Sequence, residues 1–321
     1  MKSRRRKNFL IMGAGVLGSG VGGLLASAGY DVTLVGRERI MKPIREKGLR
    51  ITGILGERIL RLKAVSSVKQ VQSQPDIILL TTKAYDTEEA VKAVMELMKE
   101  DSVVLSLQNG IGNVETIAEL VGKERTLGGM IITGFEWVRD AEVSVTVSGD
   151  KTKIGELNGE ITPRLLEIAD AFSTAGLPTE AVSDIQSHIW AKALFNASLN
   201  PLSAIFRVPY GELANPYAFA IIREIVKEAF AVAKAEHVKL LWGSYEEYLE
   251  YLGKVQLPRT AKHRSSMLKD IENGKRTEID YINGIFVRLG EKHNIPTPVN
   301  ETLMRQLKFL STPILGYSIS F

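Results

Sequence analysis

The sequence predicts an α/β protein in which an N-terminal doubly wound parallel sheet, residues 1–180, is followed by an all-helical domain, residues 181–321. In the first half, short β-rich runs alternate with helical patterns, which is typical of such a sheet. A glycine-rich turn directly after the first expected strand opens a helix. From about Pro178 onward, long amphipathic stretches follow one another with few strand patterns, and they predict the helical domain.

The elements of the first half alternate in a regular order. Strands are expected at Phe9–Met12, Asp31–Val35, Asp76–Thr82, Val103–Leu107 and around Met130–Thr133. Helices are expected between them at Val16–Ser27, Thr87–Met98 and Val114–Val121. The segment Gly48–Val65 is expected to form an inserted hairpin that turns near Gly56.

Composition excludes several classes of protein. A chain of 321 residues, 45% of them hydrophobic, can bury a sizeable core and divide into two domains. The surplus of 41 basic over 37 acidic residues is too small to argue for nucleic acid. Zero cysteines and four scattered histidines argue against disulfides, a cysteine nucleophile and a metal site. No apolar stretch approaches the ~20 residues that span a bilayer, so no membrane segment is predicted.

The N-terminus resembles an export signal, because the basic run Ser3–Lys7 precedes an apolar run that ends in Ala26–Ala28. The apolar run, however, carries glycines at spacings that a nucleotide-binding fold explains and that a signal does not need. We therefore expect a cytoplasmic protein with a short, solvated basic tail.

The first chemical motif is the glycine turn, which consists of Gly13, Ala14, Gly15, Val16, Leu17 and Gly18. Gly13 permits a tight turn, Gly15 lets the backbone approach a pyrophosphate, and Gly18 allows close packing of helix on strand. The N–H groups and dipole of the helix N-terminus then favour phosphate. Strand, turn, helix and second strand follow in order, so this context predicts a Rossmann-type dinucleotide site rather than a flexible turn.

The end of the second expected strand bears on the choice of cofactor. An NAD-selective site usually places an acidic residue there to accept from the ribose 2′-hydroxyl. This chain has Gly36 and Arg37 instead, and a guanidinium pairs with the 2′-phosphate of NADPH. NADPH is the expected cofactor, and NADH stays an alternative because Glu38 follows directly and can reach a ribose.

Two further loops lie where a doubly wound sheet presents its ligand crevice, at the carboxyl ends of strands. Lys83 follows one expected strand and is placed to neutralise phosphate or substrate charge. Asn109 follows another and is placed to bond the nicotinamide or the substrate. As isolated residues, Lys83 and Asn109 would more often be a solvated charge or a turn former than parts of a site. Their shared position makes the two interpretations about equal.

The helical half supplies the expected catalyst on one helix face. At about 100° per residue, Lys192, Asn196 and Asn200 fall within roughly 80° of one another. Their neighbours are mostly apolar, so buried polar groups there need polar partners, and a substrate with oxo, hydroxyl and carboxylate groups supplies them. The alternative is a lysine that extends its charged end to solvent, but two asparagines repeated at this spacing favour a site.

A second polar cluster runs from Arg264 to Gly284. Thr277 is placed to cap a helix with Glu278 in its first turn, and from the residues alone this capping role is the preferred interpretation of Glu278. Ser266 has a similar alternative as a hydroxyl at the start of a helix.

At these residues the chain resembles the ketopantoate reductase family. The likeness runs through Gly13–Gly18, Lys83, Gln108–Gly112, Lys192–Pro201, Ser265–Ile271 and Thr277–Gly284. The resemblance implies a Rossmann domain joined to a helical domain, with 2-dehydropantoate held in the cleft between them and reduced by NADPH to pantoate, a step of pantothenate and coenzyme A biosynthesis. It further implies Lys192 as proton donor and Glu278 as its essential companion. Substrate contacts would be Asn109, Asn196, Asn200 and Ser266, with cofactor contacts from the glycine turn, Arg37, Lys83, Asn109 and Glu278.

One departure concerns His263, where some members carry an asparagine that touches substrate, whereas Arg37 matches the family's NADPH-selective arginine. Other classes stay open at this point: a reductase of another small branched 2-oxo acid, a related enzyme acting on a 3-hydroxy acid, and a non-catalytic dinucleotide sensor. A partner-binding protein would use the aromatic stretch of Trp242, Tyr245, Tyr248 and Tyr251. Core packing, or a contact between subunits of a homodimer, explains that helical spacing more simply.

Overall fold

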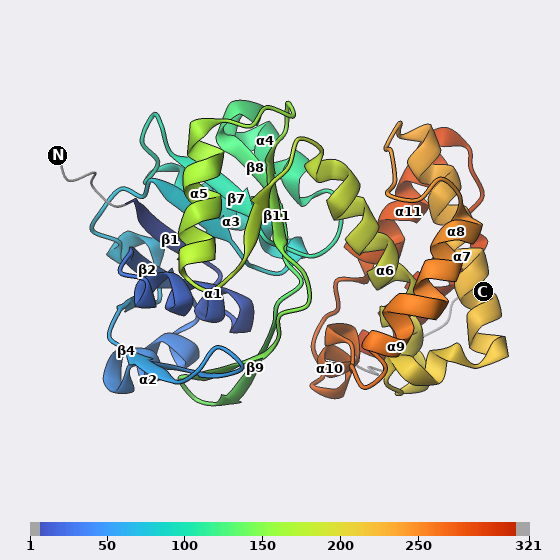
Figure 1. Ribbon diagram of the computed structural model, residues 1–321, viewed down its shortest axis with the longest axis horizontal. Coiled ribbons are helices and arrows are strands. Elements are labelled where there is room, and N and C mark those ends of the chain that lie inside the picture. The colour runs from blue at the N-terminus through green and yellow to red at the C-terminus, as the bar shows by residue number, and fades with distance from the viewer. Residues whose placement is uncertain (1–6, 313–321) are drawn as a thin grey trace, which may run out of the picture. The chain divides into compact units, whose positions relative to one another are not determined.

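A computed structural model describes residues 7–312. The basic segment at positions 3–6, expected to be a solvated tail, lies outside the described residues. The chain divides into two compact units, each described by itself below (Figure 1). The first unit comprises residues 1–108 and 112–189, and the second comprises residues 109–111 and 190–321.

The first unit is built on an eight-stranded sheet of order β12-β11-β8-β7-β6-β1-β2-β5. All neighbouring strands are parallel except β11 and β8. Its strands are β1 (Asn8–Met12), β2 (Asp31–Val35), β5 (Lys63–Val65), β6 (Ile77–Leu80), β7 (Val103–Ser106), β8 (Thr126–Met130), β11 (Thr152–Glu156) and β12 (Thr179–Ala181). A four-stranded sheet of order β4-β3-β10-β9 joins β3 (Leu49–Gly53), β4 (Arg58–Leu60), β9 (Gly134–Arg139) and β10 (Glu142–Val147).

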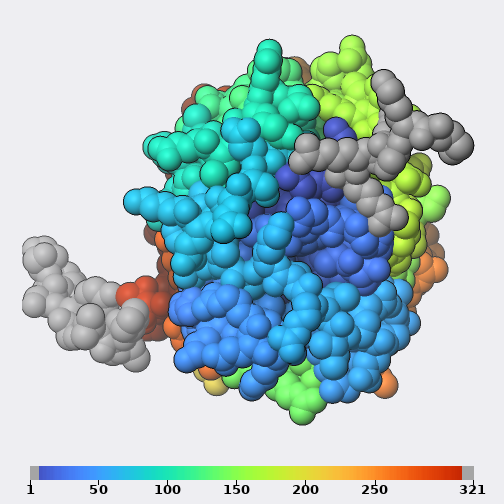
Figure 2. All heavy atoms as spheres, turned by 90° about the vertical axis from the view of Figure 1, so that its left-hand side faces the viewer, coloured from blue at the N-terminus to red at the C-terminus, as the bar shows by residue number. Residues whose placement is uncertain are grey.

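Alternate residues of the central strands face two separate cores, as the period of a strand requires. The unit's helices are α1 (Val16–Ser27), α2 (Glu38–Lys47), α3 (Thr87–Met95), α4 (Asn113–Val121) and α5 (Pro163–Thr174). On one side Ile11 packs in a cluster with residues of α1 and α5, and on the other Leu10 packs in a cluster with residues of α3 and α4. Both faces of the sheet are therefore covered. In Figure 2 the visible face is formed mostly by the N-terminal third of the chain, in blue to cyan.

The second unit is helical in its described part. Its helices are α6 (Ile185–Phe206), α7 (Pro216–Ala235), α8 (Tyr245–Tyr251), α9 (Leu257–Arg259), α10 (Ser266–Glu272), α11 (Ile279–His293) and α12 (Pro298–Ser311). A π-helical turn, η5 (Leu252–Gln256), joins α8 to α9. α6 begins in the first unit and continues into the second at Trp190. Within residues 7–312, no helix is long and apolar enough to cross a membrane.

The predicted fold class is confirmed, with three corrections in the first unit. The strand expected around Met130–Thr133 lies earlier in the chain: it runs from Thr126 to Met130, and residues 131–133 belong to no strand. The expected hairpin forms only between β3 and β4, with Gly56 at positive φ, whereas β5 pairs with β2 in the main sheet. The hairpin of β9 and β10 was not predicted, nor were the helices α2 and α5 and the strands β11 and β12.

Candidate functional site

The glycine turn lies between the carboxyl end of β1 and the start of α1. Because β1 pairs with β2 on one side and β6 on the other, this is the point where the strand order reverses, and such sheets bind ligands there. Gly13 has φ +95°, and a Cβ on it would lie 2.5 Å from the backbone nitrogen of Thr82. A Cβ on Gly18 would lie 2.5 Å from Thr81 Oγ1. Glycine is therefore required at both positions for the turn to pack against the end of β6.

Gly15 has a different environment, since the nearest atom to a Cβ built on it is Gly13 O at 3.8 Å. The protein leaves the space above Gly15 open. α1 begins here without a side-chain cap and without an acidic residue in its first turn. Its first N–H groups have no intrahelical acceptor, and the helix dipole adds positive potential. The turn therefore fits the pyrophosphate of a dinucleotide.

Arg37 and Glu38 lie at the start of α2, shortly after β2. They differ in their ion pairs with other residues of the protein. Glu38 accepts a hydrogen bond from Arg45, which lowers the pKa of the Glu38 carboxyl below its ordinary value. Arg37 is exposed and has no ion pair within residues 7–312. The exposed Glu38 carboxylate is thus engaged by Arg45, while the Arg37 guanidinium is available to an anion.

A hydrogen-bonded network holds together the loops that follow β6 and β7. Gln108 Nε2 donates to Thr82 Oγ1 at 3.1 Å and to Thr87 Oγ1 at 2.9 Å. The Thr87 hydroxyl also lies 2.9 Å from Asn113 Oδ1 of α4. Lys83 lies within this arrangement, at the residue before a 3₁₀ turn, η2 (Ala84–Asp86). Lys83 is therefore carried on a backbone fixed from both sides.

The residues after Gln108 group with the second unit, so Asn109 and Lys83 do not share a unit. Ile111 N donates to Tyr281 O of α11 at 3.0 Å. Gly110 has φ +89°, and a Cβ on it would lie 2.5 Å from the same Tyr281 oxygen. The Asn109 segment is thereby attached to the first turn of the helix that begins after Glu278.

α6 carries Lys192, Asn196 and Asn200 on successive turns of one helix. Burial lowers the pKa of Lys192 to about 8, while the charge of Glu278 acts in the opposite direction. Asn196 is 8% exposed and makes no side-chain hydrogen bond within residues 7–312. Asn200 Oδ1 accepts from the hydroxyl of buried Tyr210. A buried amide without partners, such as that of Asn196, suits a polar ligand.

Glu278 is buried at 6% exposure and is itself the residue that precedes α11. Its side chain makes no capping hydrogen bond, so the capping role expected for Thr277 and Glu278 is wrong. The hydroxyl of Thr277, 2% exposed, has no hydrogen-bond partner in the described part of the chain. The charge of Glu278 acts on Lys192 and partly opposes the lowering of the Lys192 pKa by burial.

The two serines at the start of α10, Ser265 and Ser266, have different roles. Ser265, fully buried, caps the helix by accepting from Leu268 N at 2.9 Å, and its Oγ lies 3.5 Å from Asn200 O. Ser266 is exposed and has no hydrogen-bond partner among the residues described. The helix-start role considered for Ser266 therefore belongs to Ser265, and the Ser266 hydroxyl stays available for a ligand.

Sequence reasoning missed Tyr210, which fixes the Asn200 amide. Tyr210 also packs against His263, with ring centroids 5.0 Å apart, and its N donates to His263 O at 3.0 Å. Nothing in the local pattern around Tyr210 marks it, because its partners are distant in sequence. Within the aromatic stretch, Tyr248 is fully buried and its ring lies 4.6 Å from that of half-buried Trp242, whereas Tyr251 is exposed.

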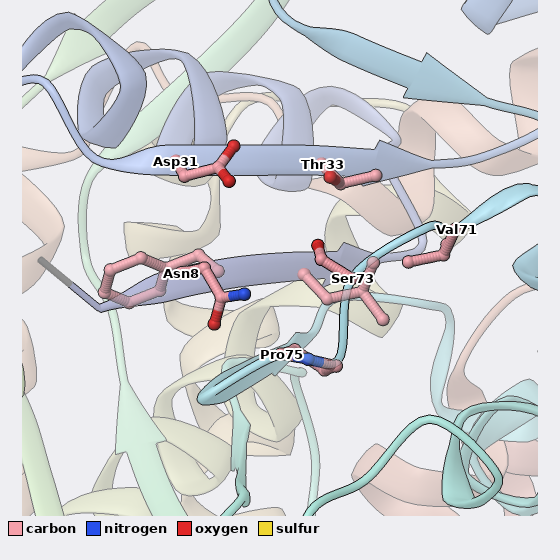
Figure 3. Close-up of a pocket in the computed structure, with 8 residues that line it drawn as sticks. Asn8, Asp31, Thr33, Val71, Ser73 and Pro75 are labelled. Carbon is pink, nitrogen blue, oxygen red and sulfur yellow. The ribbon is translucent and has the colours of Figure 1, made fainter. Parts of the chain in front are cut away.

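A pocket elsewhere in the first unit does not belong to this site. Asn8, Asp31 and Thr33 line it from β1 and β2, and the loop before β6 completes it (Figure 3). Asn8 Nδ2 already donates to Gln74 O at 2.9 Å, and Asp31 pairs with Lys63 at 3.0 Å. It begins at the amino ends of the strands, away from the glycine turn.

The second unit thus gathers groups with complementary chemistry. An ammonium whose pKa is near 8 can protonate an oxyanion near neutral pH. Amide and hydroxyl donors without protein acceptors can bind carbonyl and carboxylate oxygens. The first unit supplies an anion-binding turn and an exposed arginine. Each unit, taken by itself, thus carries groups suited to one partner of a reduction: the first to a dinucleotide, the second to a small anionic carbonyl compound.

Comparison with known proteins agrees with this chemistry. The family described as ketopantoate reductase PanE/ApbA matches residues 9–159, and its C-terminal counterpart matches residues 184–311. A 2-dehydropantoate 2-reductase of Archaeoglobus fulgidus is 39% identical over 95% of this chain and 98% of its own. The crystal structure of a PanE/ApbA family ketopantoate reductase from Ralstonia eutropha has a TM-score of 0.86 at 31% identity, covering 95% and 98% of the two chains.

A second similar structure belongs to an enzyme with a different activity. A D-mandelate dehydrogenase in a ternary structure with NADH and anilino(oxo)acetate has a TM-score of 0.87 at 30% identity. The comparison covers 95% of this chain and 98% of that one. The same architecture thus occurs in a D-mandelate dehydrogenase whose structure contains NADH and anilino(oxo)acetate.

Proposed function

The chain belongs to the ketopantoate reductase family, and from that membership we infer that it is an oxidoreductase which reduces 2-dehydropantoate to pantoate with a nicotinamide cofactor. From the site, the inference depends on partly buried Lys192 and buried Glu278, whose charge acts on the Lys192 ammonium, because a dinucleotide sensor needs neither residue. The open amide of Asn196 and the free hydroxyl of Ser266 add groups suited to a small 2-oxo acid.

In this account Lys192 is the general acid. The bound cofactor supplies the hydride that reduces C2 of the substrate. As C2 is reduced its oxygen gains negative charge, which the Lys192 ammonium stabilises before giving up a proton from Nζ. Glu278 keeps the ammonium protonated by its charge. Asn109, Asn196, Asn200 and Ser266 bind and orient the substrate's oxygens, and Lys192 regains its proton from solvent after turnover.

The expected cofactor is NADPH, held by the glycine turn, Arg37, Lys83, Asn109 and Glu278. Two features of the first unit support NADPH over NADH. The Glu38 carboxylate, which an NAD-selective site would use, is engaged by Arg45. The Arg37 guanidinium has no ion pair within residues 7–312 and pairs well with a phosphate.

Replacing Arg37 with alanine should weaken NADPH binding much more than NADH binding. A charge-assisted phosphate contact is worth about 1.5 to 3 kcal/mol, or roughly 10- to 100-fold in Kd. Titration of both cofactors into wild type and Arg37→Ala measures the change. Arg39→Ala is the matched control, because Arg39 is also exposed and lies two residues further along. An unchanged preference in Arg37→Ala, or an equal loss in the control, would contradict the assignment.

The proposed activity is tested by following NADPH oxidation with a panel of 2-oxo acids. The panel includes 2-dehydropantoate, a smaller branched 2-oxo acid and the aromatic 2-oxo acid that corresponds to mandelate. The last is included because of the D-mandelate dehydrogenase structure. We expect the highest kcat/KM with 2-dehydropantoate. A higher kcat/KM with another acid would make that acid the substrate. If no acid of the panel supports NADPH oxidation, the proposal that the protein reduces 2-oxo acids is refuted.

We propose that the boundary between cofactor and catalytic domains falls at residues 180 and 181. The homodimer and the cytoplasmic location expected from the sequence stay predictions.

A further inference from the structure

Pro201 lies inside α6, one residue beyond Asn200. Proline has no backbone N–H, so it cannot donate to the carbonyl four residues earlier, which in this helix is that of Ala197. Ala197 is fully buried and directly follows Asn196. The proline therefore leaves a buried carbonyl without its helical donor on the helix that carries the polar face, and an unpaired carbonyl there would be costly.

Asn283 of α11 supplies the missing donor. Its Nδ2 lies 3.1 Å from Ala197 O and 2.9 Å from Asn300 Oδ1, so both amide hydrogens have acceptors. The side chain is fully buried, and its own Oδ1 has no hydrogen-bond partner in the described part of the chain. Asn283 thus contributes hydrogen bonds only through its Nδ2 group, while its Oδ1 accepts none from the described residues.

A second set of hydrogen bonds fixes the orientation of this amide. Asn300 Nδ2 donates to Glu228 Oε2 of α7 at 2.7 Å, which leaves Asn300 Oδ1 facing Asn283. The Glu228 carboxylate also accepts from the backbone N–H groups of Val299 and Asn300 at 2.9 and 3.0 Å. A negative charge is favourable at the start of α12. A connected polar network therefore runs from α7 through α12 to Asn283 and ends on α6.

We propose that Asn283 is a positioning residue for the reaction: by bonding the carbonyl that Pro201 leaves free, it fixes the register of α6 against α11 and so holds Lys192 and Asn196 relative to Glu278. The proposal rests on the proposed function, because it concerns the alignment of that catalytic pair. Glu278 precedes α11 by one residue, and Asn283 lies in the first turns of the same helix. Apolar packing alone holds helices together, whereas a satisfied polar network specifies one arrangement.

The test compares Asn283→Leu in two backgrounds, wild type and Pro201→Ala. Leucine has nearly the shape of asparagine but donates no hydrogen bond. Alanine at position 201 restores a backbone N–H for the Ala197 carbonyl. With Pro201 present, Asn283→Leu should lower both the melting temperature and kcat. Asn283→Leu leaves two acceptors without a donor, Ala197 O and Asn300 Oδ1. In the Pro201→Ala background the loss in melting temperature should become smaller, because the backbone N–H of residue 201 then donates to Ala197 O.

The loss in kcat should persist in the Pro201→Ala background, at about 10-fold or more, because small misplacements of catalytic groups greatly reduce the rate. The KM for NADPH should not change. If the losses in kcat and in melting temperature shrink together, Asn283 only satisfies a carbonyl and the positioning role is refuted. The Pro201→Ala background also keeps the test available where Asn283→Leu alone is too unstable.

A readout that needs no turnover separates this proposal from the proposed function. Glu278 raises the pKa of Lys192, so loss of register should lower that pKa, followed by NMR of ¹³C-labelled lysine. The Lys192→Arg variant identifies the resonance. A lower pKa in both Asn283→Leu proteins supports the positioning role even if the wild type reduces no 2-oxo acid. An unchanged pKa together with kcat within about two-fold of its background overturns it.

Discussion

Lys192→Ala should lose about 10²- to 10⁴-fold in kcat for reduction of 2-dehydropantoate, while NADPH still binds. The loss falls on kcat because the ammonium acts mainly on charge that develops in the transition state. Removing a general acid typically costs this much, and the ammonium also stabilises the developing oxyanion. NADPH affinity should persist, because the glycine turn and Arg37 belong to the first unit. Steady-state kinetics and a fluorescence titration of NADPH measure the two quantities.

Lys192→Arg is the matched control, since it keeps a positive charge on the same turn of α6. A guanidinium does not release its proton near neutral pH and has a different shape, so the rate should not return. Recovery of most of the rate by arginine would mean that charge alone matters. Turnover of the alanine variant within a few-fold of wild type would make Lys192 a packing residue and refute the mechanism.

Glu278→Gln should lower kcat/KM by about 100-fold or more while the protein stays folded. The amide keeps the size of the side chain but removes the charge that supports protonated Lys192. A residue that merely stabilised the start of α11 would contribute a fraction of a kcal/mol to folding, and activity would survive its loss. The Glu278 side chain makes no capping bond, which favours the catalytic role. Kinetics and thermal unfolding of the same preparation separate the two effects.

Asp280→Asn is a suitable control for Glu278→Gln. Asp280 lies on the first turn of the same helix and forms an ion pair with Lys308 at 2.6 Å, so its interactions are with other residues than Lys192. It should lose little activity. Near-normal kinetics for Glu278→Gln, accompanied by a lower melting temperature, would assign Glu278 a structural role and would contradict the account.

Periodicity and local motifs predicted much of the first unit, because those features depend on neighbours in sequence. From the alternation of strands and helices and from the glycine turn, the sequence predicted the main sheet, the position of α1 and the edge of the sheet where a ligand binds. The β9–β10 hairpin escaped prediction because its pairing with β3 joins segments far apart in the chain. The strand placed around Met130 was shifted because Gly128 and Gly129 weaken the β pattern of residues that nevertheless extend in a buried β8.

The site was partly predictable for the same reason. The spacing of Lys192, Asn196 and Asn200 on one helix follows from the sequence, because it needs only the helical period. The environment of Glu278 does not, since local chemistry favoured a cap, whereas the Glu278 side chain is buried, makes no capping hydrogen bond and acts by its charge on Lys192. Tyr210 and Asn283 act across distances of many residues, on Asn200 and on Ala197. Contacts of that kind have no periodic signature.

The central claim, that Lys192 donates the proton, is tested most directly by the pH dependence of kcat/KM for 2-dehydropantoate at saturating NADPH. This parameter reports groups of the enzyme before substrate binds. Burial places the Lys192 pKa at about 8, and the protonated form is the active one in reduction. kcat/KM should therefore be high below pH 8 and fall about tenfold per pH unit above it, with the fall beginning at lower pH in Glu278→Gln. A profile that stays level from pH 7 to about 10 in the wild type would contradict the claim, since the donor would then not be a group with the pKa of Lys192.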